Sequence, residues 1–315
     1  MPLKISILGL GSMGKNHLRT LSLLKEVDIQ YIYDFDEAIL KNLSSEYNVA
    51  YTLDFDEAVQ GCDAVYIVTP TSTHLEYFKK TSPIVKNIFI EKPLTASYKE
   101  GLELSRISMQ NNNFVQCGFV ERFNPAFESL IQLVQGQEII NIDFTRTNKL
   151  SSRIIDVDVV LDLMIHDIDL ALSLNGPVKM IYSFGAYSGG QLGFCNALLK
   201  HENGAISRLL ASRMTEKKIR NIQITTDKAF IEAELLKKTV IVHKQSEVID
   251  DKSKPYQINS VQQEIEVGFQ EALLTENKVF LENCIGKFSK NTPNLKSSLQ
   301  ALKLAQEIID NIEKS

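Results

Sequence analysis

The first fourteen residues constrain the fold most, because they join an apolar strand to a glycine-rich turn and the start of a helix. Residues 5–8 form a short, largely apolar run typical of a buried parallel strand, and Gly9, Gly11 and Gly14 follow it. In the spacing G-x-G-x-x-G, these glycines respectively allow the tight turn, the approach of a pyrophosphate and close helix–strand packing. The N–H groups of the first helical turn would then face the phosphates of a dinucleotide.

An acidic residue ends the next predicted strand. Residues 29–33 are predicted to form that strand, and Asp34 follows, 20 residues after Gly14. A carboxylate at this position can accept both hydroxyls of the adenosine ribose and would repel a 2′-phosphate. The alternative is that Asp34 only opens a turn before the next helix. Together, the turn and the carboxylate favour a dinucleotide site that prefers NAD to NADP.

Two further strands run into turns that belong to the same predicted crevice. Residues 64–68 lead into Thr69–His74, and residues 87–90 lead into Glu91-Lys92-Pro93. A lysine there could stabilise negative charge on a reacting oxygen, although an ordinary surface lysine is the alternative. The predicted cofactor-binding residues are Gly9, Gly11, Ser12, Met13, Gly14, Asp34, Thr69, Pro70, Thr71, His74, Glu91 and Lys92.

A later helical segment, residues 158–175, is apolar over nearly all of its surface outside one polar stripe. At 100° per residue, five polar residues fall within an arc of about 80°: Asp158, Asp162, His166, Asp169 and Ser173. Asp162 and His166 are four residues apart and therefore neighbours. A carboxylate can orient an imidazole for acid–base chemistry near neutral pH, but a satisfied buried pair or a solvated edge is the alternative. A zinc site is less favoured, because no third ligand has metal spacing.

Length and local pattern together predict two domains. A chain of 315 residues exceeds a comfortable single core. Helical and apolar strand segments alternate up to about residue 120, which predicts a doubly wound parallel sheet. Later segments read as antiparallel strands, with a hairpin turn at Asn203-Gly204. We therefore predict an α/β fold with an NAD-binding domain in residues 1–120 and an α+β domain, built on an open, mostly antiparallel sheet, in residues 121–315.

Helix-start signals recur along the chain. Capping boxes are predicted at Thr73 with Glu76, at Ser97 with Glu100 and at Ser260 with Gln263. The dipeptide Thr292-Pro293 is typical of a helix start and predicts a last helix that runs to about residue 312.

Composition excludes several classes of function. The net charge of −5 provides no basic footprint for nucleic acid. The four cysteines are scattered and lack metal-ligand spacing, so we expect free thiols in a reducing compartment. No apolar run is as long as a membrane span, and the chain enters its first strand directly after Met1-Pro2-Leu3. A cytoplasmic protein is expected.

The ordered combination of motifs resembles the Gfo/Idh/MocA family of NAD(P)-dependent sugar and cyclitol oxidoreductases. The resemblance covers essentially the whole chain and rests on four motifs, namely the glycine turn ending in His17, the segment Thr69–His74, Glu91-Lys92-Pro93, and Asp162 with His166. It implies an N-terminal Rossmann domain and a C-terminal domain with an open sheet. It also implies that the last helix, about residues 293–312, packs back on the first domain.

The resemblance implies an active site made by Lys92, Asp162 and His166. Many members carry glycine-rich residues around the D-x-x-x-H segment, whereas this chain has large apolar residues there. Residues 118–126 and 162–169 are similar to bacterial UDP-N-acetylglucosamine 3-dehydrogenases. Such enzymes oxidise the sugar 3-hydroxyl to a ketone, and a partner aminotransferase then installs an amine on the way to modified lipid A.

The substrate and the assembly leave several alternatives open. A nucleotide-sugar diphosphate requires positive and polar groups, and the candidates, each of which could equally be structural, are Arg122, Asn124, Arg146, Arg153 and Arg213. Another sugar or a cyclitol such as an inositol is a rival substrate. A non-catalytic sugar or nucleotide sensor is the rival outside enzymes, although the presence of Lys92, Asp162 and His166 together argues against it. An open sheet face predicts a homodimer or homotetramer.

Overall fold

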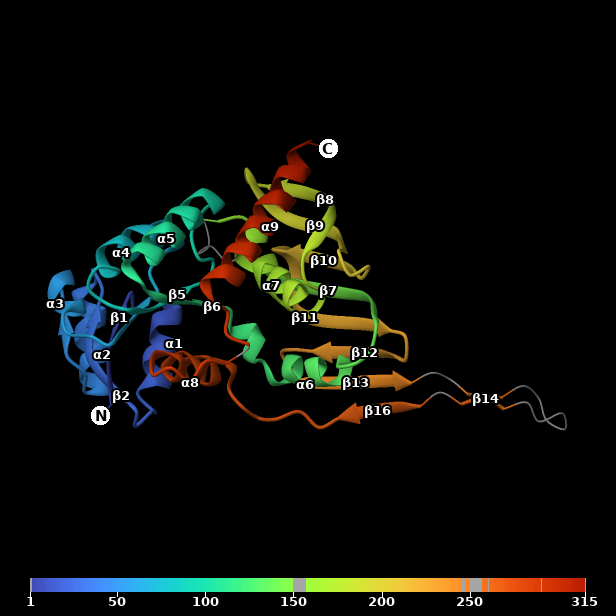
Figure 1. The fold of residues 1–315 in the computed structure, drawn as a ribbon, viewed down its shortest axis with the longest axis horizontal. Helices are drawn as coiled ribbons and strands as arrows, with labels where there is room; N and C mark the ends of the chain where they lie inside the picture. Colours follow the sequence, from blue (N-terminus) through green and yellow to red (C-terminus); the bar gives the residue numbers. More distant parts are fainter. Residues whose placement is uncertain are drawn as a thin grey trace. The chain divides into compact units, whose positions relative to one another are not determined.

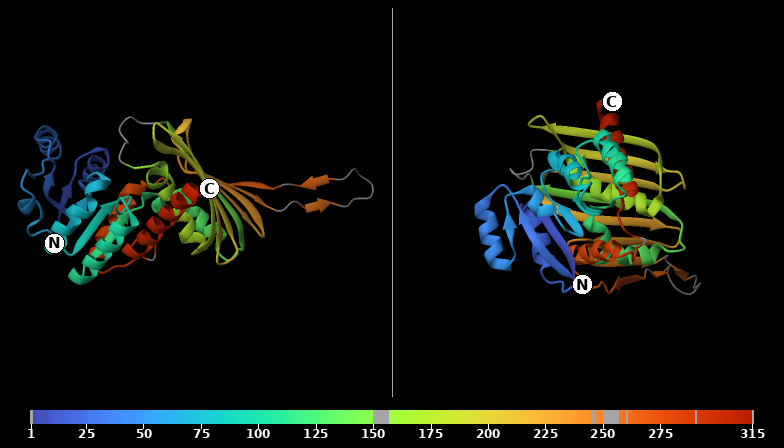
Figure 2. Two further views of the ribbon diagram at one scale, coloured as in Figure 1. Left: turned by 90° about the horizontal axis from the view of Figure 1, so that it is seen from above. Right: turned by 60° about the vertical axis from the view of Figure 1, so that its left-hand side comes forward.

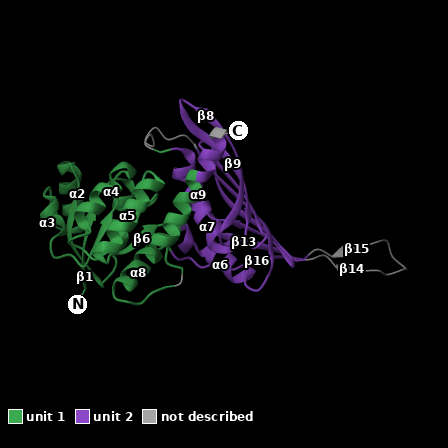
Figure 3. Cartoon of the chain, turned by 45° about the horizontal axis from the view of Figure 1, so that its top comes forward, with its two compact units in different colours: residues 1–120, 154–157, 271–306 green, residues 121–153, 158–270, 307–315 purple. Residues whose placement is uncertain are grey.

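The computed structural model describes six stretches of the chain, with elements labelled in Figure 1: residues 2–149, 157–244, 247–249, 257–259, 261–289 and 291–314. The chain divides into two compact units (Figure 3). Unit 1 consists mainly of residues 1–120 and 271–306, and unit 2 mainly of residues 121–153, 158–270 and 307–315. Residues 271–306 were predicted to lie in the second domain, but in the structure they belong to unit 1.

Unit 1 is built on a parallel sheet with strand order β3-β2-β1-β4-β5-β6. The strands are β1 (Leu3–Leu8), β2 (Val27–Tyr33), β3 (Tyr51–Thr52), β4 (Ala64–Ile67), β5 (Asn87–Glu91) and β6 (Phe114–Gly118). The helices between them are α1 (Ser12–Leu21), α2 (Glu37–Tyr47), α3 (Phe55–Val59), α4 (His74–Thr81) and α5 (Tyr98–Asn111). This order reverses beside β1, as in dinucleotide-binding folds, and confirms the predicted doubly wound sheet.

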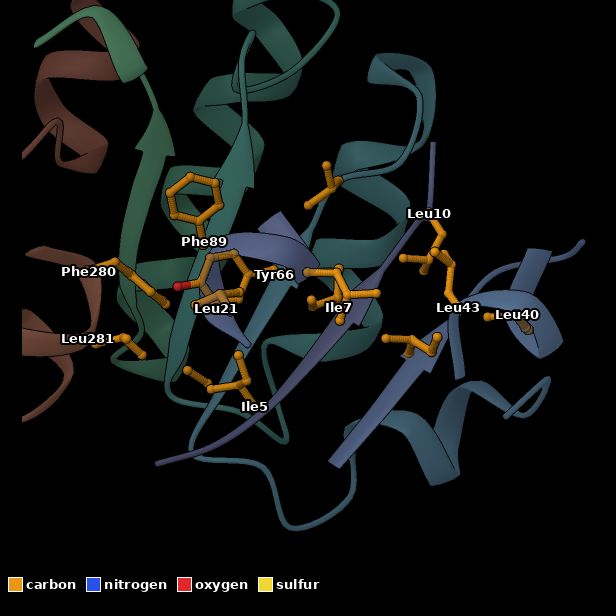
Figure 4. Close-up of a cluster of buried hydrophobic side chains, with 14 residues drawn as sticks. Ile5, Ile7, Leu10, Leu21, Leu40, Leu43, Tyr66, Phe89, Phe280 and Leu281 are labelled. Carbon is orange, nitrogen blue, oxygen red and sulfur yellow. The ribbon is translucent and has the colours of Figure 1, made fainter. Parts of the chain in front are cut away.

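The core of unit 1 includes side chains from a helix that is distant in sequence. Helix α8 (Ala272–Cys284) contributes Phe280 and Leu281 to the same buried cluster as residues of β1, α1 and β4 (Figure 4). The Phe280 ring lies 5.1 Å from the Tyr66 ring and 5.5 Å from the Phe89 ring, measured between centroids. Burial of these aromatic rings stabilises the unit and explains why α8 belongs to it.

Unit 2 is built on a sheet with strand order β16-β13-β12-β11-β7-β10-β9-β8. Its strands are β7 (Ile139–Lys149), β8 (Val178–Ser188), β9 (Gln191–His201), β10 (Ile206–Ser212), β11 (Met214–Thr226), β12 (Ala229–Glu234), β13 (Thr239–Lys244) and β16 (Gln262–Ile265). All neighbours are antiparallel except β7 and β10. The mostly antiparallel sheet is therefore confirmed. A separate ribbon pairs β14 (Glu247–Ile249) with β15 (Gln257–Asn259).

Helices cover one face of the large sheet (Figure 2). Helix α6 (Pro125–Val134) contacts β12 and β13, and α7 (Ile165–Asn175) contacts β7 and β10. The end of α9 (Leu295–Lys314) packs against β8, where the Ser183 hydroxyl donates to the Ile308 carbonyl at 2.7 Å. Of the predicted last helix, the part up to residue 306 belongs to unit 1 and the remainder to unit 2.

Some helix-start predictions are wrong. Residue 260 lies outside the described residues, but Gln263 lies in strand β16, and α8 begins only at Ala272. The Thr73 hydroxyl donates to the Pro70 carbonyl at 2.7 Å and makes no cap bond to the helix that follows. Ser97, in contrast, caps α5 by accepting from the Glu100 N–H at 3.3 Å. Helix α9 starts at Leu295, two residues after Pro293.

Buried ion pairs hold α7 to the sheet of unit 2. Arg146, on β7, is 2% exposed and donates to Asp167 at 2.8 Å and to Glu121 at 2.8 Å. Arg122 makes a two-pronged pair with Asp169, with N–O distances of 2.6 and 2.5 Å. The prediction that Arg146 and Arg122 bind substrate is not supported, because both guanidinium groups are committed to buried carboxylates.

The buried charges of this cluster stabilise one another, because each arginine lies beside a carboxylate. Burial disfavours the charge on Arg146, but Asp167 and Glu121 together raise its pKa above the ordinary value. Burial also disfavours ionisation of Glu121, yet Arg146 and Arg220 hold the pKa of that carboxyl below its usual range. Removal of one partner would leave an uncompensated buried charge.

Substitution of Arg146 by Met should therefore destabilise the protein rather than weaken substrate binding selectively. The expected loss in free energy of unfolding is about 3–5 kcal/mol, because Asp167 and Glu121 would lose their counter-charge. Urea unfolding measures the loss. Arg208→Met is the matched control, because the exposed Arg208–Asp143 pair should contribute less than about 1 kcal/mol. Equal stability of the two variants would contradict the structural role of Arg146.

Candidate functional site

A cavity of about 520 Å³ opens in unit 1 where several parallel strands reach their carboxyl ends. Nine predicted cofactor residues line it, namely Gly9, Gly11, Ser12, Met13, Asp34, Thr69, Pro70, Glu91 and Lys92. Three others, Gly14, Thr71 and His74, are not among its lining residues. The lining also includes residues that the sequence analysis missed, namely Tyr33, Phe35, Val68, Thr73 and Tyr77. Tyr33 and Phe35 flank Asp34 at the end of β2, so their place in the lining could have been predicted from that of Asp34.

The glycines shape one wall of the cavity. A Cβ atom on residue 14 would lie 1.9 Å from the Gly9 carbonyl oxygen, so only glycine allows α1 to begin this close to β1. A Cβ atom on residue 11 would have no atom within 4 Å, which leaves open space in front of the backbone. Gly11 precedes α1 and has no side chain to cap its first N–H groups. Those groups can bind a pyrophosphate.

Asp34 is held in place by backbone donors. The Leu10 N–H donates to Asp34 Oδ2 at 2.6 Å, and the Asp36 N–H donates to Asp34 Oδ1 at 3.1 Å. The first bond links the end of β2 to the glycine turn. A fixed carboxylate beside an open glycine turn fits the ribose and pyrophosphate of NAD, so the residues present suit this cofactor.

The lysine-bearing turn follows β5. Glu91 Oε2 accepts the Lys92 N–H at 3.0 Å, and Glu91 Oε1 lies 3.0 Å from His17 Nε2. His74 lies beneath the neighbouring turns, with its ring nitrogens 2.9 Å from the carbonyls of Thr69 and Pro93. Burial lowers the pKa of His74, and these carbonyl contacts act in the opposite direction. His74 therefore tethers two turns that border the cavity.

The helix that carries the predicted acid–base pair is not a regular α-helix throughout. Val160–Met164 form a π-helical turn, and α7 continues from Ile165. Asp162 and His166 are both buried, with exposures of 8% and 9%. Arg213 donates to Asp162 Oδ2 through Nε at 3.2 Å, and its Nη2 lies 3.0 Å from the same oxygen. The pair between Arg213 and Asp162 was not predicted, because Arg213 was a candidate for binding substrate.

The remaining predicted residues have structural contacts. Asp158 accepts the N–H groups of Val160 and Leu161 at 2.7 and 2.9 Å, and burial raises the pKa of its carboxyl. Asn124 accepts the Ala126 N–H at the start of α6 and donates to Glu121 and the Leu235 carbonyl. Arg153 lies outside the described residues.

The described part of the chain lacks a metal-binding cluster and a membrane-spanning helix. No three His, Cys, Asp or Glu side chains in that part are grouped to hold a metal ion. None of its helices is long and apolar enough to cross a membrane. The cytoplasmic location stays a prediction.

The chain is similar to curated proteins that are named as sugar or cyclitol dehydrogenases. The UDP-N-acetylglucosamine 3-dehydrogenase of Acidithiobacillus ferrooxidans is 25% identical over 243 residues, which are 76% of this chain and 77% of that protein. Its solved structure gives a TM-score of 0.88 at 21% identity, covering 100% of this chain and 99% of the other. The NAD-dependent scyllo-inositol 2-dehydrogenase of Bacillus subtilis is 36% identical over 123 residues, which are 37% of this chain and 36% of that protein.

Two sequence models of one family also match the chain. The oxidoreductase family model with an NAD-binding Rossmann fold matches residues 3–119, and the model of the Gfo/Idh/MocA C-terminal domain matches residues 143–232. Together these matches span more than half of the chain and fall on the parallel and antiparallel sheets respectively. The chain therefore belongs to the Gfo/Idh/MocA family of oxidoreductases, and its first part is that family's NAD-binding Rossmann fold.

Proposed function

We propose that the protein is an NAD-dependent dehydrogenase that oxidises a secondary hydroxyl group of a sugar to a ketone. The observation that carries this proposal is the cavity of unit 1, whose lining brings together Gly11, Asp34 and Lys92. This combination provides places for a pyrophosphate, for ribose hydroxyls and for a developing negative charge. Family membership supports the same reaction class.

In the proposed reaction, the C–H and O–H bonds of the sugar alcohol break and a C=O double bond forms. Bound NAD would accept the hydride. His166 takes the hydroxyl proton, and Asp162 stabilises the imidazolium that results. Lys92 stabilises the alkoxide as its charge develops, although Lys92 and His166 could exchange these roles. Arg213, paired with Asp162 at 3.0 Å, fixes the orientation of that carboxyl group.

We propose the 3-hydroxyl of UDP-N-acetylglucosamine as the site of oxidation, in a pathway to lipid A or another surface glycan. The similarity to the enzyme from Acidithiobacillus ferrooxidans, which extends over 76% of this chain, supports this substrate. An inositol is the second candidate, because the inositol dehydrogenase of Bacillus subtilis is 36% identical over a shorter stretch. A non-catalytic sensor is a third candidate, which any turnover of substrate would eliminate.

Turnover across a small panel of UDP-sugars and free polyols separates these candidates. NADH formation should be fastest with UDP-N-acetylglucosamine, and the product should carry a ketone at C3, as identified by NMR after borodeuteride reduction. The His166→Asn variant should lose about 100-fold or more in kcat while it binds NAD almost as tightly, because it loses only the proton acceptor. Calorimetric titration with NAD provides the control. Faster oxidation of an inositol would contradict the nucleotide-sugar assignment.

The preference for NAD should depend on Asp34. In Asp34→Asn the carboxylate charge is lost, so KM for NAD should rise about tenfold or more, and the kcat/KM ratio of NADP to NAD should increase. Asp28→Asn, an exposed residue near the start of the same strand, is the matched control. An unchanged cofactor ratio in Asp34→Asn would remove Asp34 from cofactor selection.

We propose that a second copy of the chain covers the open face of the sheet in unit 2. This face exposes Tyr182 by 56%, Phe184 by 67% and Leu198 by 44%, and Tyr182 lies opposite Leu198 in the register of β8 and β9. Burial of such a patch is favourable. Light scattering should give a dimer or tetramer, and Phe184→Asp should reduce its size. Phe269→Asp, at a residue that is 96% exposed outside the sheet, should not. A monomeric wild type would refute this assembly.

A further inference from the structure

A buried hydrogen-bonded chain lies directly behind the lysine-bearing turn, entirely within unit 1. His17, on α1, is fully buried and lies between two partners. Its Nε2 atom is 3.0 Å from Glu91 Oε1, and its Nδ1 atom is 3.0 Å from Asn277 Oδ1. Glu91 Oε2 accepts the Lys92 N–H at 3.0 Å. Three elements distant in sequence, namely α1, β5 and α8, therefore converge on the residue that precedes Lys92.

The other side of His17 is held by a second buried side chain. The Asn277 amide lies between His17 and Thr20, with Oδ1 3.0 Å from His17 Nδ1 and Nδ2 2.8 Å from the Thr20 hydroxyl oxygen. The Thr20 hydroxyl lies 2.9 Å from the Asn16 carbonyl in turn. The imidazole ring is therefore held at both of its nitrogens, which fixes the orientation in which it meets Glu91.

A glycine on the adjacent strand makes room for the carboxyl group. Gly118, at the end of β6, lies opposite Glu91 in the strand register. A Cβ atom on residue 118 would lie 2.9 Å from the Glu91 carboxyl carbon and 2.9 Å from Oε1. The carboxyl group cannot move away freely, because both of its oxygens are engaged. Contacts with His17 and with the Lys92 backbone therefore hold the Glu91 carboxyl group, and the missing side chain at Gly118 leaves the room that it occupies.

We propose that the His17–Glu91 pair is a positioning device that fixes the backbone of Lys92. His17 holds one carboxyl oxygen of Glu91, and the other oxygen accepts the Lys92 N–H, so the start of the lysine turn is held in one position. A lysine on a fixed backbone is better placed to stabilise a developing negative charge. The inference rests on the proposed role of Lys92, and it makes His17, Glu91 and Gly118 positioning residues.

Two substitutions test the position of this carboxyl group. Gly118→Ala pushes the carboxyl group aside without changing any charge. It should lower kcat at saturating NAD at least about tenfold with little change in NAD affinity. Glu91→Leu, which removes both bonds, should lose as much kcat as Gly118→Ala or more. Gly268→Ala is the matched control, because a Cβ atom there meets no neighbour within 4 Å.

A second measurement does not depend on turnover. The rate at which an amine-selective reagent labels Lys92, read by mass spectrometry, should change at least about threefold in Gly118→Ala and should stay near the wild-type rate in Gly268→Ala. Lys86, in the same protein, serves as the internal standard. Unchanged labelling and unchanged kcat in folded Gly118→Ala would overturn the positioning role. Full kcat in folded Glu91→Leu would overturn it too. If the protein oxidises no sugar at all, the proposed function is wrong. The labelling rate of Lys92 still tests the positioning role of the His17–Glu91 pair in that case.

Discussion

Unit 1 depends on one close approach, between the start of α1 and the end of β1. Any side chain at position 14 would collide with the Gly9 carbonyl, at 1.9 Å from the nearest possible Cβ atom. Because the helix lies this close, its first N–H groups border the cavity that Asp34 also lines. The same helix carries His17 to Glu91 at the end of another strand. One steric constraint thus positions both the pyrophosphate-binding backbone and the support of the lysine turn.

Unit 2 is organised by a different interaction, the pairing of buried charges. Helix α7 is apolar over most of its surface, yet Asp167 and Asp169 are almost completely buried. Each meets an arginine from outside the helix, and the preceding π-helical turn places Asp162 beside a third. Buried pairs of this kind specify orientation more than they add net stability. They orient the helix that carries His166 against the sheet.

The parts of the fold that the sequence predicts are those with a local cause. Apolar runs predicted the strands of the parallel sheet, and the glycine spacing, Asp34 and the turns that follow two later strands together predicted most of the cavity lining. The partners of His17, by contrast, are 74 and 260 residues away, and no local pattern identifies them. A capping signal around Gln263 gave a wrong helix, because pairing with β13 overrides local preference. The carboxylate partners of Arg122 and Arg146 could not be predicted for a related reason, since they are tertiary contacts that no local pattern shows.

The π-helical turn at Val160–Met164 has one further consequence. Its hydrogen bonds close over one residue more than those of an α-helix, so it accommodates one surplus residue. Side chains beyond the turn are therefore rotated by roughly 100° relative to a regular helix that started at the same point. Loss or gain of a single amino acid here would turn a different set of carboxylates toward the arginines. Evolution can thus redirect this helix by changing its length by one position, with every other side chain retained.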